Sequence, residues 1–136
     1  MPDIIMLPVG GGGLAAGVTH YFADQGREAR FVFCEPAGAP SLHDSLAAGK
    51  RLKLAKVDNF VDGAAVAEIG REPLRYLKEF AADTVRLIPE NRLCATMIEM
   101  LNVEGVVLEP AGALAIDALK DFSRKDIRGK TIVAVV

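Results

Sequence analysis

The sequence is poor in several features, and each shortage excludes a class of protein. It has only two cysteines, Cys34 and Cys94, which form neither a disulfide framework nor a metal-binding pattern. No apolar run approaches the roughly 18 residues that would cross a membrane. No block of lysine and arginine stands out, and the formal net charge is −2. We therefore expect no membrane association and no nucleic-acid partner.

The N-terminus also lacks the pattern of a secretory signal. Asp3 stands where a basic region would be needed, and the apolar run that follows it stops at glycines. We therefore expect a cytoplasmic protein. Cys34 lies in an apolar run, which predicts a buried thiol.

What the sequence does contain suffices for one globular domain. Its 136 residues are 51% hydrophobic and 25% charged. Strand-like and helix-like segments alternate, which predicts a single α/β domain over residues 1–136, with a mostly parallel sheet flanked by helices. The expected strands are 4–9, 30–34, 84–88 and 131–136, and the expected helices are 13–25, 41–48, 71–82, 89–102 and 110–122.

The connections and the chain end carry further expectations. Ser41 is expected to cap its helix. Residues 50–59 and 124–130 are expected to be solvated loops, because charged runs usually are. The chain ends on an apolar strand, where a functional loop would start in an open α/β sheet, so we expect a fragment.

The most unusual stretch is the run of four glycines from Gly10 to Gly13, between an apolar strand and a helix of small residues. Adjacent glycines cost conformational entropy, so they indicate a backbone that comes close to another group. A turn between a strand and a helix N-terminus presents free N–H groups and the positive end of the helix dipole. The run therefore predicts a phosphate-binding loop.

On spacing alone, the run fits a dinucleotide site. Gly10, Gly12 and Ala15 satisfy the dinucleotide-binding fingerprint, and Glu35 ends the second strand where a ribose-binding acid would lie. A Rossmann-type NAD-binding domain is thus one interpretation. Against it, the motif has no need of a fourth glycine, and Pro8 removes a backbone donor near the end of a central strand. A glycine turn that serves only helix–strand packing is another interpretation.

Several motifs recur together in the order of a known enzyme family. They are residues 8–14 (PVGGGGL), 33–36 (FCEP), 60–70 (FVDGAAVAEIG), 109–115 (EPAGALA) and 129–130 with the last strand. Through these motifs, essentially the whole chain resembles the threonine dehydratase and serine racemase group of fold-type II pyridoxal-phosphate enzymes. Two of the blocks are more similar to threonine dehydratase of the branched-chain amino-acid pathway, which makes isoleucine.

The resemblance implies a fold, a cofactor and a set of binding residues. The chain would be the second half of the larger domain, in the C-terminal part of the catalytic region, of an enzyme that deaminates L-threonine to 2-oxobutanoate and ammonia. The cofactor, pyridoxal 5'-phosphate, would be held at its phosphate by Gly10, Gly11, Gly12, Gly13 and Leu14. Gly63 would lie beside its pyridine ring, and Glu109 would approach the site. For Glu109, a carboxylate that merely stabilises the start of its helix is an equal alternative.

The same resemblance shows which groups are missing from the chain. The family uses a lysine that forms a Schiff base with the cofactor, and none of the seven lysines lies in the required Ser-x-Lys context. Glu35 and the backbone of Ala39 match a divalent-cation site of the family, but Ser41 replaces an acid there, so we expect no metal. We expect no catalytic residue in this chain and no activity from it alone. Exposed sheet edges also predict a homo-oligomer.

Overall fold

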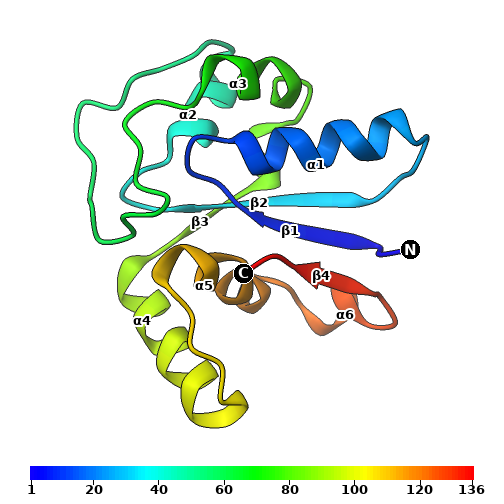
Figure 1. Cartoon of the computed structure of the whole chain (residues 1–136), viewed down its shortest axis with the longest axis vertical. Coiled ribbons are helices and arrows are strands. Elements are labelled where there is room, and N and C mark those ends of the chain that lie inside the picture. The colour runs from blue at the N-terminus through cyan, green and yellow to red at the C-terminus, as the bar shows by residue number, and fades with distance from the viewer.

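The structure is a computed structural model that describes all 136 residues. A four-stranded sheet forms its centre, with helices on both faces (Figure 1). The strands are β1 (Ile4–Pro8), β2 (Arg30–Pro36), β3 (Val85–Ile88) and β4 (Ile132–Ala134), in the spatial order β3-β2-β1-β4. All neighbouring pairs are parallel, which confirms the predicted α/β fold.

The helices divide into two layers (Figure 1). On one face lie α1 (Gly13–Asp24), α2 (Ser41–Ala48) and α3 (Arg71–Leu77), and on the other lie α4 (Glu90–Glu99), α5 (Pro110–Asp117) and α6 (Arg124–Ile127). Three short helical turns complete the fold: η1 (Ala82–Thr84), η2 (Met100–Glu104) and η3 (Ala118–Asp121). The chain therefore alternates between the sheet and its two covering layers.

Two apolar cores follow from this layering. Met6 and Cys34 point to the side of α4 and α5, whereas Leu7 and Phe33 point to the side of α1, α2 and α3. Successive strand residues face opposite sides, and both sides are covered, so the strands read as continuous apolar runs. Cys34 is fully buried, as predicted, and burial raises the pKa of its thiol to about 12.

Three predicted helix ends are wrong by several residues. Helix α3 ends at Leu77 rather than at residue 82, and Ala82–Thr84 form a separate 3-10 turn before β3. Helix α4 passes at Met100 into a π-helical turn that Gly105 ends in a left-handed conformation, with φ of 67°. Helix α5 ends at Asp117 and continues as η3. In α4 and α5 a change of helix type, which leaves the apolar spacing almost unaltered, interrupts the predicted element. After α3 the chain instead makes a turn, with Ala81 extended, before η1 begins.

Two local predictions at helix starts also need correction. Pro40, not Ser41, is the N-cap of α2, and Ser41 Oγ instead donates to Glu35 Oε1 at 3.3 Å.

The stretch 124–130 contains the one-turn helix α6, which begins with a capping box formed by Ser123 and Asp126. The hydroxyl of Ser123 accepts from the Asp126 N–H while the Asp126 carboxylate accepts from the Ser123 N–H.

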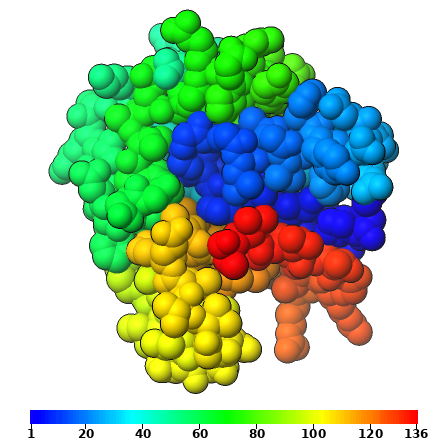
Figure 2. All heavy atoms as spheres, in the orientation of Figure 1, coloured from blue at the N-terminus to red at the C-terminus, as the bar shows by residue number.

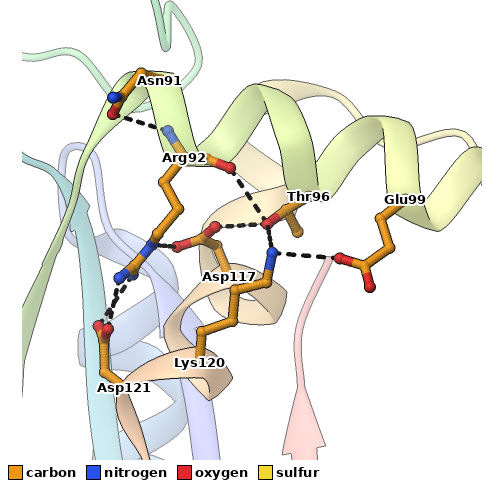
Figure 3. Close-up of polar contacts among 7 residues, drawn as sticks. All are labelled: Asn91, Arg92, Thr96, Glu99, Asp117, Lys120 and Asp121. Carbon is orange, nitrogen blue, oxygen red and sulfur yellow. Dashed lines mark hydrogen bonds and ion pairs between the residues drawn. The ribbon is translucent and has the colours of Figure 1, made fainter.

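A buried polar network joins α4 to α5 and η3 (Figure 3). The fully buried Asp117 accepts hydrogen bonds from Arg92 Nε at 2.6 Å and from Thr96 Oγ1 at 2.5 Å. Arg92 also donates to both oxygens of Asp121, at 2.6 and 3.1 Å, and these bonds raise the pKa of its guanidinium. Lys120 Nζ donates to Thr96 Oγ1 at 2.7 Å. The network fixes α4 against α5 with ionic contacts as well as apolar ones.

Candidate functional site

The glycine run lies at the carboxyl end of β1, where the chain turns into α1. Gly12 is the N-cap and has φ of 86°, a left-handed conformation that favours glycine. A Cβ at Gly12 would lie 2.6 Å from Ile69 Cδ1, and one at Gly10 would lie 3.0 Å from the Cα of Ala64. Backbone conformation and packing therefore require glycine at these two positions.

Gly11 and Gly13 are glycines for a different reason. Apart from its chain neighbours and the backbone of its own helix, no atom lies within 4 Å of the position that a Cβ would take at either residue. Neither residue has a left-handed φ. Nothing inside the protein excludes a side chain there, so the two positions keep a space open beside the backbone.

The backbone donors of the run are unused. None of the N–H groups from Gly10 to Leu14 donates to an acceptor within the chain. Helix α1 has no side-chain cap and no acidic residue in its first turn. The positive end of its dipole is therefore available to an external anion.

These groups border a cavity of about 230 Å³, which three segments of the chain build together. Its lining consists of Pro8, Gly10, Gly11, Gly12, Gly13, Leu14, Gly63, Ala64 and Ala111. A Cβ at Gly63 would lie 3.0 Å from the Cβ of Ala111 and 3.8 Å from Glu109 Oε2. Six of the seven residues predicted from the sequence thus line one cavity, namely the glycine run, Leu14 and Gly63. The seventh, Glu109, is the N-cap of α5 and lies next to Gly63 without lining the cavity.

Glu35 does not belong to this group. Its carboxylate is fully buried against the start of α2, where Leu42 N–H donates to Oε1 at 2.7 Å and His43 N–H donates to Oε2 at 2.9 Å. Burial raises the pKa of Glu35 to about 7 despite these bonds. Both oxygens are engaged inside the protein, so the ribose-binding role that spacing suggested for Glu35 is not what the structure shows. No cluster of three His, Cys, Asp or Glu side chains suits a metal ion.

A family model of pyridoxal-phosphate dependent enzymes matches residues 1–136, the full length of the chain. The chain belongs to this family. Pyridoxal phosphate is accordingly the family's cofactor, and the cavity fits its phosphate, because open glycines and unused N–H groups meet there. None of the comparisons supports the NAD-binding alternative.

Curated relatives narrow the family. The chain is 42% identical over 134 residues to "L-threonine dehydratase biosynthetic IlvA" of Halalkalibacterium halodurans. It is 44% identical over 135 residues to the protein of the same name from Bacillus subtilis. The matches cover 98% and 99% of this chain but 32% of each relative. The chain thus spans about a third of the length of the curated relatives that it matches.

Solved structures of pyridoxal-phosphate enzymes share the fold. The processed form of threonine deaminase isoform 2 from Solanum lycopersicum superposes with a TM-score of 0.86 and 34% identity, over 98% of this chain and 40% of that one. Serine racemase from Dictyostelium discoideum superposes with a TM-score of 0.79 and 26% identity, over 99% and 43%. The resemblance to the threonine dehydratase and serine racemase group is confirmed.

Sequence reasoning missed the residues that brace the glycine run. Gly70 N–H donates to Gly11 O at 3.0 Å, and the buried side chain of Ile69 packs against Gly12. A Cβ at Gly70 would lie 2.9 Å from Gly11 O, so glycine is needed there for close backbone approach. Ile69 and Gly70 are the last two residues of the 60–70 motif, but the motif itself does not reveal what they touch.

None of the helices is long and apolar enough to cross a membrane.

Proposed function

We propose that this chain supplies the phosphate-binding part of a pyridoxal-phosphate dependent threonine dehydratase, which deaminates L-threonine to 2-oxobutanoate and ammonia in isoleucine biosynthesis. The family match over the whole chain and the two relatives at 42% and 44% identity support this assignment. The single structural observation that carries it is the row of unused N–H groups from Gly10 to Leu14 beside an open cavity.

In this proposal the glycine run binds the cofactor's phosphate. The N–H groups of Gly10, Gly11, Gly12, Gly13 and Leu14 would donate to phosphate oxygens, and the dipole of the twelve-residue helix α1 would add to the attraction. A phosphate dianion is a strong acceptor, and charge-assisted hydrogen bonds are about twice as strong as neutral ones. Gly11 and Gly13 would leave room for its oxygens.

The opposite wall of the cavity would position the rest of the cofactor. Gly63 lacks a side chain where α5 approaches closely, and Glu109 lies at the same wall. We assign them as residues that flank the pyridine ring. When bound, pyridoxal phosphate supplies an electron sink for negative charge that develops at the substrate's α-carbon. This chain's residues would hold and orient it.

The reacting groups would come from outside these 136 residues. None of the seven lysines lines the cavity. The chain alone is therefore expected to bind the cofactor without acting on threonine. We further propose that the parent enzyme is cytoplasmic, and fractionation of producing cells tests this location.

A melting experiment tests the proposed function. Pyridoxal phosphate should raise the Tm of the purified chain, and pyridoxal, which lacks the phosphate, should not. At a hundred times Kd the stabilisation is about 2.7 kcal/mol. Gly11→Asp should abolish the shift, because its carboxylate would enter the phosphate space; the open surroundings of Gly11 should let this variant fold normally. Incubation with threonine and cofactor should release no ammonia.

Two results would contradict the proposal. One is a Tm that rises with NAD but not with pyridoxal phosphate, which would restore the dinucleotide interpretation. The other is an unchanged cofactor shift in Gly11→Asp, which would place the phosphate elsewhere. Ammonia release by the chain alone would refute the statement that it lacks the reacting groups.

A further inference from the structure

Positively charged side chains gather away from the glycine run, in a cleft between the C-terminal end of α2 and the side of α3. The cleft has a volume of about 420 Å³. Its lining comprises Lys50, Arg51, Arg71, Arg75 and Lys78, together with Ser45, Leu46, Gly49 and Leu74. The five cations are a large share of the 16 lysines and arginines in a chain of net charge −2. Such a grouping in an acidic protein calls for a counter-charge.

The chain itself neutralises only two of the five cations. Arg51 pairs with Glu68 at 2.8 Å, and Arg75 pairs with Glu72 at 2.8 Å. The other three, Lys50, Arg71 and Lys78, form no ion pair and no side-chain hydrogen bond within the chain. The cleft therefore keeps an excess of three positive charges, whose mutual repulsion an anion would relieve.

Part of the cleft wall is held in place before any ligand arrives. Arg51 Nε donates to Ile69 O at 2.7 Å while its other guanidinium nitrogen pairs with Glu68. Leu52 N–H donates to Ser45 Oγ at 3.1 Å, which fixes the start of the 50–59 segment on α2. That segment was predicted to be solvated, but Arg51 is anchored rather than free. Fixed groups reduce the ordering cost of binding.

We propose that this cleft binds a small ligand that carries a diphosphate group. Its volume falls within the range of about 300–1,000 Å³ that small-molecule sites occupy. Guanidinium and ammonium groups are the side chains that recognise phosphate oxygens. A diphosphate carries enough negative charge to match the excess of three, whereas a single phosphate does not. Leu46 and Leu74 give the cleft an apolar part on which a nucleoside attached to the diphosphate can lie. The inference is independent of the proposed function.

Calorimetric titration with inorganic pyrophosphate tests the site. Arg71→Gln/Lys78→Gln removes two unpaired cations and should weaken binding by about tenfold or more. Lys56→Gln/Lys125→Gln, which removes two exposed charges elsewhere, should leave the affinity unchanged. Gly11→Asp blocks the glycine run, so pyrophosphate that this variant still binds reports on the cleft alone. If circular dichroism shows that the double variant does not fold, the pyrophosphate affinity of Lys50→Gln, a single change on the other side of the cleft, is measured instead and should also be weaker than that of the native chain.

Two further arms define the ligand and the failure of the idea. The variants should change the affinity for ADP in the same way as the affinity for pyrophosphate. A higher affinity of the native chain for ADP than for pyrophosphate would indicate that the nucleoside contacts the apolar part of the cleft. Affinity should fall as sodium chloride is raised, since the contacts are ionic and exposed. The inference is wrong if a folded Arg71→Gln/Lys78→Gln variant binds pyrophosphate like the native chain. It is equally wrong if Gly11→Asp alone abolishes binding.

Discussion

At the scale of single residues, Glu35 is the side chain whose environment departs most from its local sequence. It lies near the end of an apolar strand, in a motif that suggests a ligand-binding acid, yet the fold places its carboxylate under the first turn of α2. There it accepts hydrogen bonds from the backbone N–H groups of Leu42 and His43, which leave the helix start without an unsatisfied donor. Glu35 therefore serves α2 as an internal cap supplied from another element.

The burial of Glu35 predicts a pH-dependent stability. Its pKa is about 7 in the folded chain and 4.5 as the ordinary value, so the folded state binds more protons than the unfolded state between these pH values. Stability should therefore fall as the pH rises from about 4.5 to about 7, by about 3 kcal/mol from this group. Urea unfolding at pH 5 and pH 7.5 measures the difference.

Glu35→Gln should remove most of that pH dependence, because an amide does not titrate. Glu28→Gln, at an exposed position, is the matched control and should keep the native dependence. Equal slopes of stability against pH in the native chain and in Glu35→Gln would show that another group is responsible.

At the scale of elements, the packing of α4 on α5 depends on Asp117. Its side chain is 0% exposed and is the acceptor for both Arg92 and Thr96 (Figure 3). Asp117→Ala should lower the free energy of unfolding by about 3–5 kcal/mol, because it leaves a partly buried guanidinium and a buried hydroxyl without their partner. Urea unfolding followed by circular dichroism measures the loss.

Asp121→Ala provides the comparison for this prediction. Asp121 binds the same guanidinium, but its side chain is 29% exposed, so its loss should cost about 1 kcal/mol or less. A loss in Asp117→Ala no larger than in Asp121→Ala would mean that burial does not make the Asp117 contacts special. The network would then stabilise the fold no more than a solvent-exposed ion pair does.

At the scale of the whole molecule, apolar surface gathers on two parts of the chain. The end of α4, η2 and the segment after them extend from the body as an arm, drawn in yellow in Figure 2. This arm carries exposed Ile98, Val103 and Val107, the last of them 81% exposed. β4 is an edge strand and carries the exposed Val133. Exposed apolar patches and open sheet edges both favour association.

We therefore predict that the purified chain self-associates. Sedimentation velocity at micromolar concentration should show a dimer or larger species, and Val103→Asp/Val107→Asp should shift the distribution toward monomer. Lys56→Gln/Lys125→Gln should not, since it leaves the apolar surface intact. A single monomeric boundary for the native chain over the whole concentration range would refute the prediction.

The sequence by itself determined what depends on neighbouring residues. Continuous apolar runs such as that from Ile4 to Val9 predict strands covered on both faces, and the glycine run predicts an anion-binding turn at a helix start. Helix types were less predictable, because the π-helical turn after α4 and the 3-10 turn after α5 keep nearly the same apolar spacing as an α-helix. Motif order along the chain, not spacing, distinguished pyridoxal phosphate from a dinucleotide.

Only the tertiary structure decided where side chains from distant segments meet. Gly11 and Gly63 reach one cavity because the segment between α2 and α3 packs against the glycine run, where Gly70 N–H donates to Gly11 O. The burial of Glu35, the contact of Asp117 with α4 and the cationic cleft between α2 and α3 involve partners many residues away. No local pattern encodes such contacts, because they arise from packing of whole elements. The anion-binding character of the glycine run can thus be predicted from the sequence, whereas the residues that line its cavity are known only from the fold.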